Sequence, residues 1–283
     1  MEKNHSVSRR FVLKGLGASL VSVVLGSGCA PITPPPETQG APILPSKETT
    51  RALIELYNDV YATDNLESAL CVDYYINGIP EKLPQVSESE NVWMTDILNE
   101  VSGGSHAIVA IQAPDLIDMA LNGGTVPHYT KAMQEAQKAR KGRPSTITTF
   151  SGGVGSLLGE NREDLAAAKK ITVISPAFQD GMRDEIDFKT KATGLTAKGL
   201  KFPLINDFIQ QAQKLYKLNG QTITLYLGSD DPKVDPNKVI TAIQEAIKKG
   251  TLSAEAIDIQ MIKGMEHAPS VALLKQLLLP HKE

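Results

Sequence analysis

The sequence is poor in cysteine, aromatic residues and net charge. Its 283 residues contain two cysteines, Cys29 and Cys71, and only 5% are aromatic. Two cysteines cannot build a disulfide scaffold, so stability has to come from a hydrophobic core. A formal charge of -3 gives no general attraction to nucleic acid, and we expect no nucleic-acid partner. No set of His, Cys, Asp and Glu has metal-ligand spacing, and we expect neither a metal nor another cofactor.

The apolar run near the N-terminus, residues 16–25, is too short to span a bilayer. It follows Arg9-Arg10, and this basic-then-apolar order is typical of an export signal. The paired arginines resemble a twin-arginine signal. The segment Leu25-Gly26-Ser27-Gly28-Cys29 is similar to a lipoprotein box, which implies that a lipid on Cys29 anchors the protein to a membrane. The alternative is a plain signal peptide that is cut near Ala30, which leaves a periplasmic or secreted protein.

The next segment, residues 30–47, contains six prolines and is expected to be a semi-rigid tether rather than a folded unit. We therefore divide the chain into an export signal (1–29), the tether (30–47) and one folded domain (48–283). If Cys29 carries a lipid, Cys71 has no partner, and we expect it to be a small buried hydrophobic side chain.

From residue 48 onward, strand and helix patterns alternate. Strand patterns occupy residues 70–76, 107–111, 146–150, 171–174, 222–227 and 257–262. Helical spacing occupies residues 50–61, 92–101, 127–140, 155–169, 204–217, 237–249 and 270–279. This alternation predicts the α/β class, with a mostly parallel sheet flanked by helices.

Three short segments at predicted strand ends carry the residues of a nucleophile, an acid and a base. They are Thr149-Phe150-Ser151-Gly152-Gly153, Gly228-Ser229-Asp230-Asp231-Pro232-Lys233-Val234 and Gly264-Met265-Glu266-His267. Ligands bind at the carboxyl ends of strands in such sheets. A serine hydroxyl needs an adjacent base, and a carboxylate can hold that base in the required tautomer. We predict Ser151, Asp231 and His267 as catalytic residues.

Each assignment has an alternative. Taken alone, Ser151 is better explained as a helix N-cap, a common use of serine after a strand. Only the acid and histidine segments favour the nucleophile. Asp230 and Asp235 compete with Asp231 for the role of the acid, although spacing favours Asp231. Among the histidines, His267 is the best base because it follows the last strand, whereas His106 begins a strand.

The order serine, acid, histidine is that of the α/β-hydrolase family, which residues 70–279 resemble. The segment Asn77-Gly78-Ile79-Pro80 is similar to the family's oxyanion loop. The resemblance implies that the backbone N–H groups of Gly152 and Ile79 hold the oxyanion. It also implies a serine hydrolase that cleaves an ester-like or amide bond through an acyl-enzyme.

The turn that carries Ser151 departs from the family pattern. Thr149 stands where Gly-x-Ser-x-Gly has its first glycine, Phe150 where His is common, and Asn77 where the oxyanion loop has His. None of the three removes a triad member. They leave open a non-catalytic binding module on the same scaffold.

A second alternative uses the glycines after the same strand. The segment from Gly153 to Gly159 resembles a dinucleotide-binding turn, but its spacing is Gly-x-Gly-x-x-x-Gly rather than the tighter fingerprint. The segment 178–207 lies where the hydrolase family places its lid, and it is short and rich in charge. We therefore expect a small or polar substrate.

Overall fold

The computed structural model describes residues 53–57, 60–78, 106–111, 124–138, 142–159, 162–183, 201–270 and 272. The predicted segments that lie outside the described residues are the export signal with Cys29, the tether, Ile79, the helices over 92–101 and 270–279 beyond Ser270, and residues 184–200 of the lid. The division of the chain at residues 29 and 47 therefore stays a prediction.

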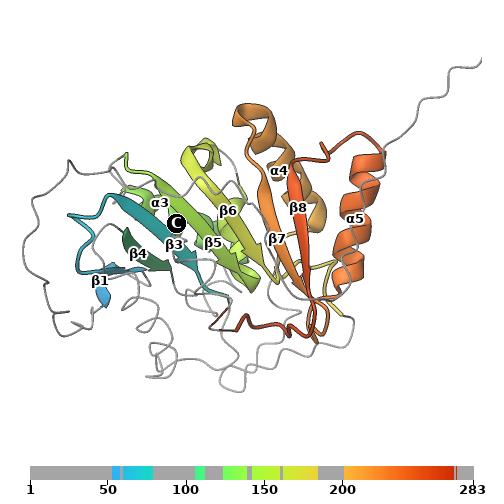
Figure 1. Cartoon of the computed structure of the whole chain (residues 1–283), viewed down its shortest axis with the longest axis horizontal. Helices are drawn as coiled ribbons and strands as arrows, with labels where there is room; N and C mark the ends of the chain where they lie inside the picture. Colours follow the sequence, from blue (N-terminus) through green and yellow to red (C-terminus); the bar gives the residue numbers. More distant parts are fainter. Residues whose placement is uncertain are drawn as a thin grey trace, which may run out of the picture.

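Eight strands form one sheet in the described part of the chain. They are β1 (Leu53–Tyr57), β2 (Val60–Thr63), β3 (Cys71–Ile76), β4 (His106–Ile111), β5 (Ser145–Phe150), β6 (Ala168–Ile174), β7 (Ile223–Gly228) and β8 (Ile257–Ile262). Their order across the sheet is β1-β2-β4-β3-β5-β6-β7-β8 (Figure 1). The pairs from β4 to β8 are parallel, whereas β1 pairs with β2, and β2 with β4, in the antiparallel direction. The predicted α/β class with a mostly parallel sheet is confirmed.

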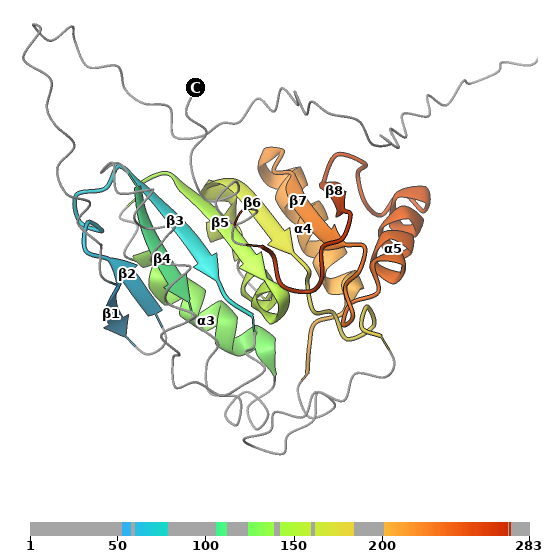
Figure 2. The ribbon, with the colours of Figure 1, turned by 60° about the horizontal axis from the view of Figure 1, so that its bottom comes forward.

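Three helices bury one face of this sheet. They are α3 (Thr125–Lys138), α4 (Ile205–Asn219) and α5 (Pro236–Lys248), and Figure 2 shows α3 crossing below β3 and β5. The register aligns Tyr74 with Ile147, Ile147 with Ile171, and Ile171 with Ile223, so these side chains share a face. They belong to one core cluster with Phe208 of α4 and other helix residues. The strand ends are thereby fixed relative to one another.

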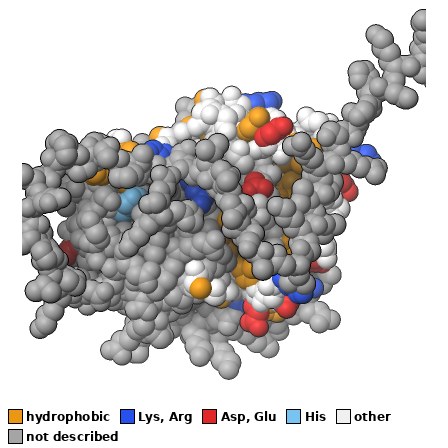
Figure 3. Space-filling view, viewed as in Figure 1, with side chains coloured by type: hydrophobic (Ala, Val, Ile, Leu, Met, Phe, Trp, Pro, Cys, Tyr) orange, Lys and Arg blue, Asp and Glu red, His pale blue; other side chains and the backbone are white. Residues whose placement is uncertain are grey.

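The opposite face of the sheet is more polar toward β8. Alternation along β7 and β8 leaves Tyr226 half-buried and Asp258 exposed, as expected where one side of a sheet meets solvent. On the described surface in Figure 3, acidic and basic side chains are interspersed. No helix in the described ranges is long and apolar enough to cross a membrane.

Cys71 at the start of β3 is buried, as expected, but it is not a plain thiol. It is disulfide-bonded, and its partner lies outside the described residues. The expectation that Cys71 has no partner, which assumed a lipid on Cys29, therefore does not hold.

The helix predicted over residues 50–61 is also wrong. Residues 53–57 and 60–63 form β1 and β2, and Val60 pairs with Ile111 of β4. The spacing of Leu53, Leu56 and Val60 suits a helix, but hydrogen bonds to a distant strand decide the conformation. Local patterns do not record such long-range pairing.

The helix predicted over residues 155–169 is replaced by two short 3-10 helices and the start of β6. These are η1 (Ser151–Leu157) and η2 (Arg162–Ala167). Four glycines between residues 152 and 159 make a long α-helix costly here. The chain turns back toward the sheet after Leu157 instead of continuing as a helix.

Candidate active site

The three predicted catalytic residues lie at one edge of the sheet. Ser151 follows β5, Asp231 follows β7 and His267 follows β8. Because these strands belong to the parallel part of the sheet, their carboxyl ends share that edge. All three side chains are largely buried, with exposed fractions of 6% for Ser151, 2% for Asp231 and 8% for His267. Segments more than 100 residues apart thus meet at one point.

Ser151 sits on a strained turn between β5 and η1. Its φ of 51° lies in the left-handed region, where residues other than glycine are uncommon. Two glycines allow this turn and the segment after β3 to lie close together. A Cβ on Gly78 would come within 2.6 Å of the Ser151 Cβ, and a Cβ on Gly153 within 2.7 Å of the Ile76 carbonyl oxygen. The turn therefore lifts the serine out of the strand instead of capping an α-helix.

His267 connects the serine to the acid. Its Nε2 lies 2.9 Å from the Ser151 Oγ, and its Nδ1 lies 3.1 and 3.0 Å from the two carboxylate oxygens of Asp231. A carboxylate accepts hydrogen bonds, so the Nδ1–H donates to Asp231 and Nε2 is left to accept from the Ser151 hydroxyl. The arrangement can take a proton from the serine.

Asp231 is held as a carboxylate by its own loop. Pro232 has no N–H, and the N–H groups of Lys233 and Val234 donate to the Asp231 Oδ1 over 2.8 and 3.0 Å. Burial alone favours the protonated acid. The hydrogen bond and charge of His267, together with these two N–H groups, outweigh burial and hold the pKa of Asp231 below its ordinary value.

The two competing acids have other partners. Asp230 accepts a hydrogen bond from the Ser229 hydroxyl over 2.6 Å. Asp235 caps α5 by accepting from the N–H of Asn237 over 3.0 Å. Of the three carboxylates in this loop, Asp231 is the one that contacts His267.

The structure describes one of the two predicted oxyanion donors. Gly152 is the second residue of η1, where N–H groups have no acceptor within a 3-10 helix. Ile79 lies outside the described residues, but the two residues before it are described. Asn77 donates its N–H to the Ile111 carbonyl, and its Oδ1 accepts from the Gly78 N–H over 2.9 Å. Asn77 thus orders the start of this loop.

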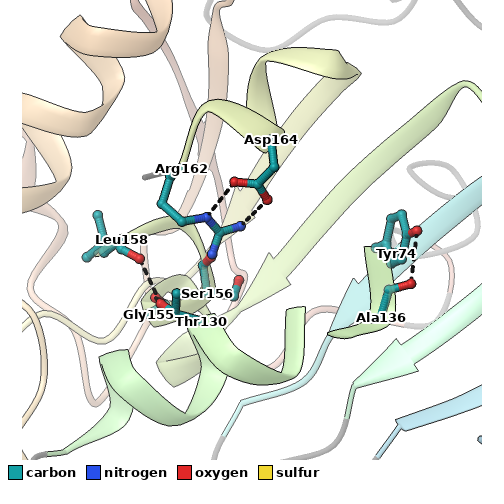
Figure 4. Close-up of polar contacts among 8 residues, drawn as sticks. All are labelled: Tyr74, Thr130, Ala136, Gly155, Ser156, Leu158, Arg162 and Asp164. Atoms are coloured by element: carbon teal, nitrogen blue, oxygen red, sulfur yellow. Dashed lines mark hydrogen bonds and ion pairs between the residues drawn. The ribbon is translucent and has the colours of Figure 1, made fainter. Parts of the chain in front are cut away.

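The far end of η1 is fastened by two side chains (Figure 4). The Thr130 hydroxyl donates to the carbonyls of Gly155 and Leu158. Arg162 is fully buried, donates its Nη1 to the Ser156 carbonyl, and forms two 2.9 Å bonds to Asp164. Burial lowers the pKa of the Arg162 guanidinium, and Asp164 opposes that shift. These contacts satisfy carbonyls that a short helix leaves open.

A small cleft opens beside the serine. The enclosed part of the cleft is about 10 Å³, which is room for about one water-sized group. The described lining is mostly apolar and is formed by Ser151, Ala177, Met182, Phe202, Lys233, Val234 and His267. An isolated antiparallel β-bridge pairs the backbone of Met182 with that of Val234, so the segment after β6 is joined to the loop that carries Asp231. Such a cleft suits a small group next to the scissile bond.

The glycines of the alternative dinucleotide turn pack against the protein itself. A Cβ on Gly153 would meet the backbone of Ile76 and Asn77, and a Cβ on Gly155 would lie 3.3 Å from the backbone of Thr125 and Val126. In a pyrophosphate-binding turn the glycines make room for the ligand. Here that room is filled by the chain.

Within the described ranges, no group of three or more His, Cys, Asp and Glu side chains is arranged to hold a metal ion.

Comparison with solved structures places the fold. A Bacillus subtilis protein designated a hydrolase matches 80% of this chain and 89% of its own, with 14% identity and a TM-score of 0.50. A puromycin-hydrolyzing peptidase from Mycobacterium tuberculosis matches 83% of this chain and 40% of its own, with 13% identity and a TM-score of 0.50. The fold is that of the α/β hydrolases. At such identities the likeness concerns the fold alone. No protein-family model and no curated protein matches the chain.

The sequence did not indicate three contacts of this hydrolase fold. Arg183 donates its Nε to the Asp231 carbonyl over 2.9 Å. The Phe150 ring lies 5.3 Å from the His267 ring. Met182 and Phe202, which both belong to the predicted lid segment 178–207, line the cleft. Only the two N–H groups that hold Asp231 had a local signal, because an aspartate in a turn commonly accepts from the residues after it.

Proposed function

We propose that the protein is an exported serine hydrolase that cleaves an ester-like or amide bond through an acyl-enzyme. The observation that carries this proposal is the continuous chain of hydrogen bonds from Ser151 through His267 to Asp231. It coincides with a positive φ at Ser151 and a cleft beside its hydroxyl.

In the proposed reaction the Ser151 Oγ attacks the carbonyl carbon of the substrate while His267 takes the hydroxyl proton. Asp231 stabilises the imidazolium that forms. The N–H groups of Gly152 and Ile79 receive the negative oxygen, and each such donor is worth about two to three orders of magnitude in rate. His267 then passes its proton to the leaving group. Water, deprotonated by the same histidine, releases the acid and restores Ser151.

The cleft supports a small substrate. Met182 and Phe202 restrict the space next to Ser151, and their apolar side chains favour a short aliphatic group over a long chain. We expect acetyl and butyryl esters to be cleaved with higher kcat/KM than octanoyl esters. Met182→Ala and Phe202→Ala should move this preference toward longer chains.

Covalent labelling tests the proposal. A fluorophosphonate probe should label the wild-type protein, and Ser151→Ala should abolish both labelling and ester hydrolysis. Ser175→Ala is the matched control, because Ser175 is also buried, also has a positive φ of 42°, and follows the neighbouring strand β6. Inactivity on a panel of short and long esters, with Ser151 unlabelled, would leave a binding module or a nucleotide-binding protein, and nicotinamide binding would separate these two.

We also propose that residues 1–29 direct export and that residues 30–47 form the tether. The signals in the sequence support this proposal. A lipid anchor on Cys29 is compatible with the structure only if Cys29 is not the disulfide partner of Cys71. Lipid attachment and a disulfide at the same sulfur exclude each other, and Cys29 is the only cysteine of the chain besides the disulfide-bonded Cys71. Peptide mapping of the native protein without reductant decides: a lipidated Cys29 peptide supports the anchor, and a Cys29–Cys71 peptide overturns it.

A further inference from the structure

Phe150, the last residue of β5, is next to the nucleophile and in contact with the base. Its ring centroid lies 5.3 Å from that of His267, and the two rings are inclined by 49°. Its side chain is half-buried. The ring also reaches the start of the oxyanion loop, because a Cβ on Gly78 would come within 3.2 Å of the Phe150 Cδ1. One side chain therefore joins three parts of the site.

The loop that carries His267 is fastened mainly to the acid side of the site. Met265 accepts from the Asp230 N–H, and Gly264 donates to the Ser229 hydroxyl. On the nucleophile side, the imidazole has the Ser151 hydroxyl and the ring of Phe150. A hydrogen bond to each nitrogen leaves the ring free to tilt about the line between them. The Phe150 ring limits that tilt.

Phe150 can also act on charge. The imidazole of His267 becomes a cation when it takes the serine proton, and an aromatic ring within about 6 Å attracts a cation. At sites that are partly desolvated, this attraction corresponds to about a three- to thirty-fold effect on an equilibrium or a rate. The distance of 5.3 Å between the two ring centroids is shorter than this limit of about 6 Å.

We propose that Phe150 is a positioning residue that holds the His267 ring between Ser151 and Asp231 and favours its protonated form during acylation. The proposal rests on the proposed hydrolase function. It gives a role to the residue that differs from the histidine common at this place in the α/β-hydrolase pattern.

The test compares Phe150→Leu with Phe150→Tyr in the full-length protein. Leucine keeps an apolar side chain and loses the ring, whereas tyrosine keeps the ring. We expect Phe150→Leu to lower the fluorophosphonate labelling rate and the kcat for acetyl esters about tenfold, with KM changed less than twofold. Phe150→Tyr should stay within threefold of the wild type. Phe150→Met is a second variant without a ring, should leucine prevent folding.

A double-mutant cycle separates this role from a structural one. If Phe150 acts through His267, then Phe150→Leu should have no further effect on the residual labelling rate in a His267→Ala background. An equal loss in both backgrounds overturns the proposal, as does a wild-type rate in Phe150→Leu. Absence of labelling in the wild type removes the proposed function and this inference with it, so the two failures are distinguishable.

Discussion

In the part of the chain that the structure describes, two aspartate–histidine pairs are buried, and one of them leads to the proposed nucleophile. In the first, His267 contacts Asp231 through Nδ1 and Ser151 through Nε2. In the second, the Nδ1 of His106 lies 2.8 Å from the Asp73 Oδ2, and the Thr146 hydroxyl lies 2.6 Å from the Asp73 Oδ1. Both pairs are buried and both have a hydroxyl nearby.

The hydroxyl groups of Ser151 and Thr146 have different hydrogen-bond partners. The Thr146 hydroxyl donates its hydrogen bond to the Asp73 carboxylate and not to the imidazole of His106. Thr146 also lies within β5, paired with Asp73 on β3, whereas Ser151 has left the same strand through a positive φ. On the proposed function, a buried Asp–His pair is therefore not sufficient for catalysis. It needs a serine that points at the second imidazole nitrogen and a cleft that admits a substrate.

The surroundings of the second pair are those of a structural network. The Asn65 side chain donates to the His106 carbonyl and accepts from the Thr63 hydroxyl, which in turn accepts from the Ile108 N–H. Such fully connected polar groups fix the packing of neighbouring segments. Here they fasten the turn after β2 to β4.

Replacing each histidine in turn should give the largest difference in activity between the two pairs. His267→Ala should lower kcat/KM by about six orders of magnitude, because the serine loses its base. His106→Ala should keep kcat/KM within twofold per folded molecule, but lose roughly 3 kcal/mol of stability, because the buried Asp73 loses the imidazole at its Oδ2 and keeps the Thr146 hydroxyl at its Oδ1. Ester hydrolysis and urea unfolding measure the two effects. The comparison fails if His106→Ala loses activity without losing stability.

The two acids give the next effect. Asp231→Asn should lower kcat by about four orders of magnitude, because the amide favours the wrong tautomer of His267. Asp73→Asn should retain the wild-type kcat and show only a lower Tm. Equal loss of kcat in both variants would mean that the distinction between the pairs is wrong.

Arg162 fixes η1, the short helix that begins at Ser151, through a hydrogen bond to the Ser156 carbonyl. Arg162→Met should cost roughly 3 kcal/mol, because it removes a buried guanidinium from Asp164 and leaves the Ser156 carbonyl without its donor. The labelling rate of Ser151 should fall as well, since η1 is no longer fixed. Lys138→Met is the control, because the Lys138–Glu135 ion pair is exposed and should contribute little to the Tm.

The smallest effect concerns pH. The pKa of Asp231 in the folded protein lies below its ordinary value of about 3.9. Its carboxylate therefore adds stability above that pH, and the contribution is lost as pH falls through the lower folded-state pKa. Asp231→Asn should accordingly show a shallower loss of Tm below pH 4 than the wild type. Parallel curves for the two proteins would show that Asp231 is not stabilised in this way.

Much of the fold could be predicted because strong local patterns coincide with the observed elements. The apolar run in β4 and the alternation in β7 each follow the period of a strand, and helices α3, α4 and α5 lie within two residues of their predicted starts. The pairing of β2 with β4 could not be predicted, because it depends on residues about 50 positions apart. The glycines after Ser151 were visible in the sequence, but the hydrogen bond from Arg162 to the Ser156 carbonyl was not.

The candidate site could be predicted from the sequence for a different reason. Ser151, Asp231 and His267 follow strands whose carboxyl ends must meet, so their order along the chain predicted their proximity. The second pair had only one signal, a lone aspartate in the apolar run from Cys71 to Ile76. Nothing in the sequence links Asp73 to His106, because only the register of β3 with β4 brings them together. The contact of Phe150 with His267 depends on side-chain packing in the same way.

The central claim is that the Asp231–His267 pair activates Ser151 and that the Asp73–His106 pair activates nothing. The most direct measurement is peptide mapping after a short incubation with an acetyl ester and an acid quench, which traps an acyl-enzyme. The account predicts one acetyl group on the peptide that contains Ser151, and none in the His267→Ala variant. An acetyl group on Thr146 or on another residue, or an unmodified Ser151 during turnover, would contradict it.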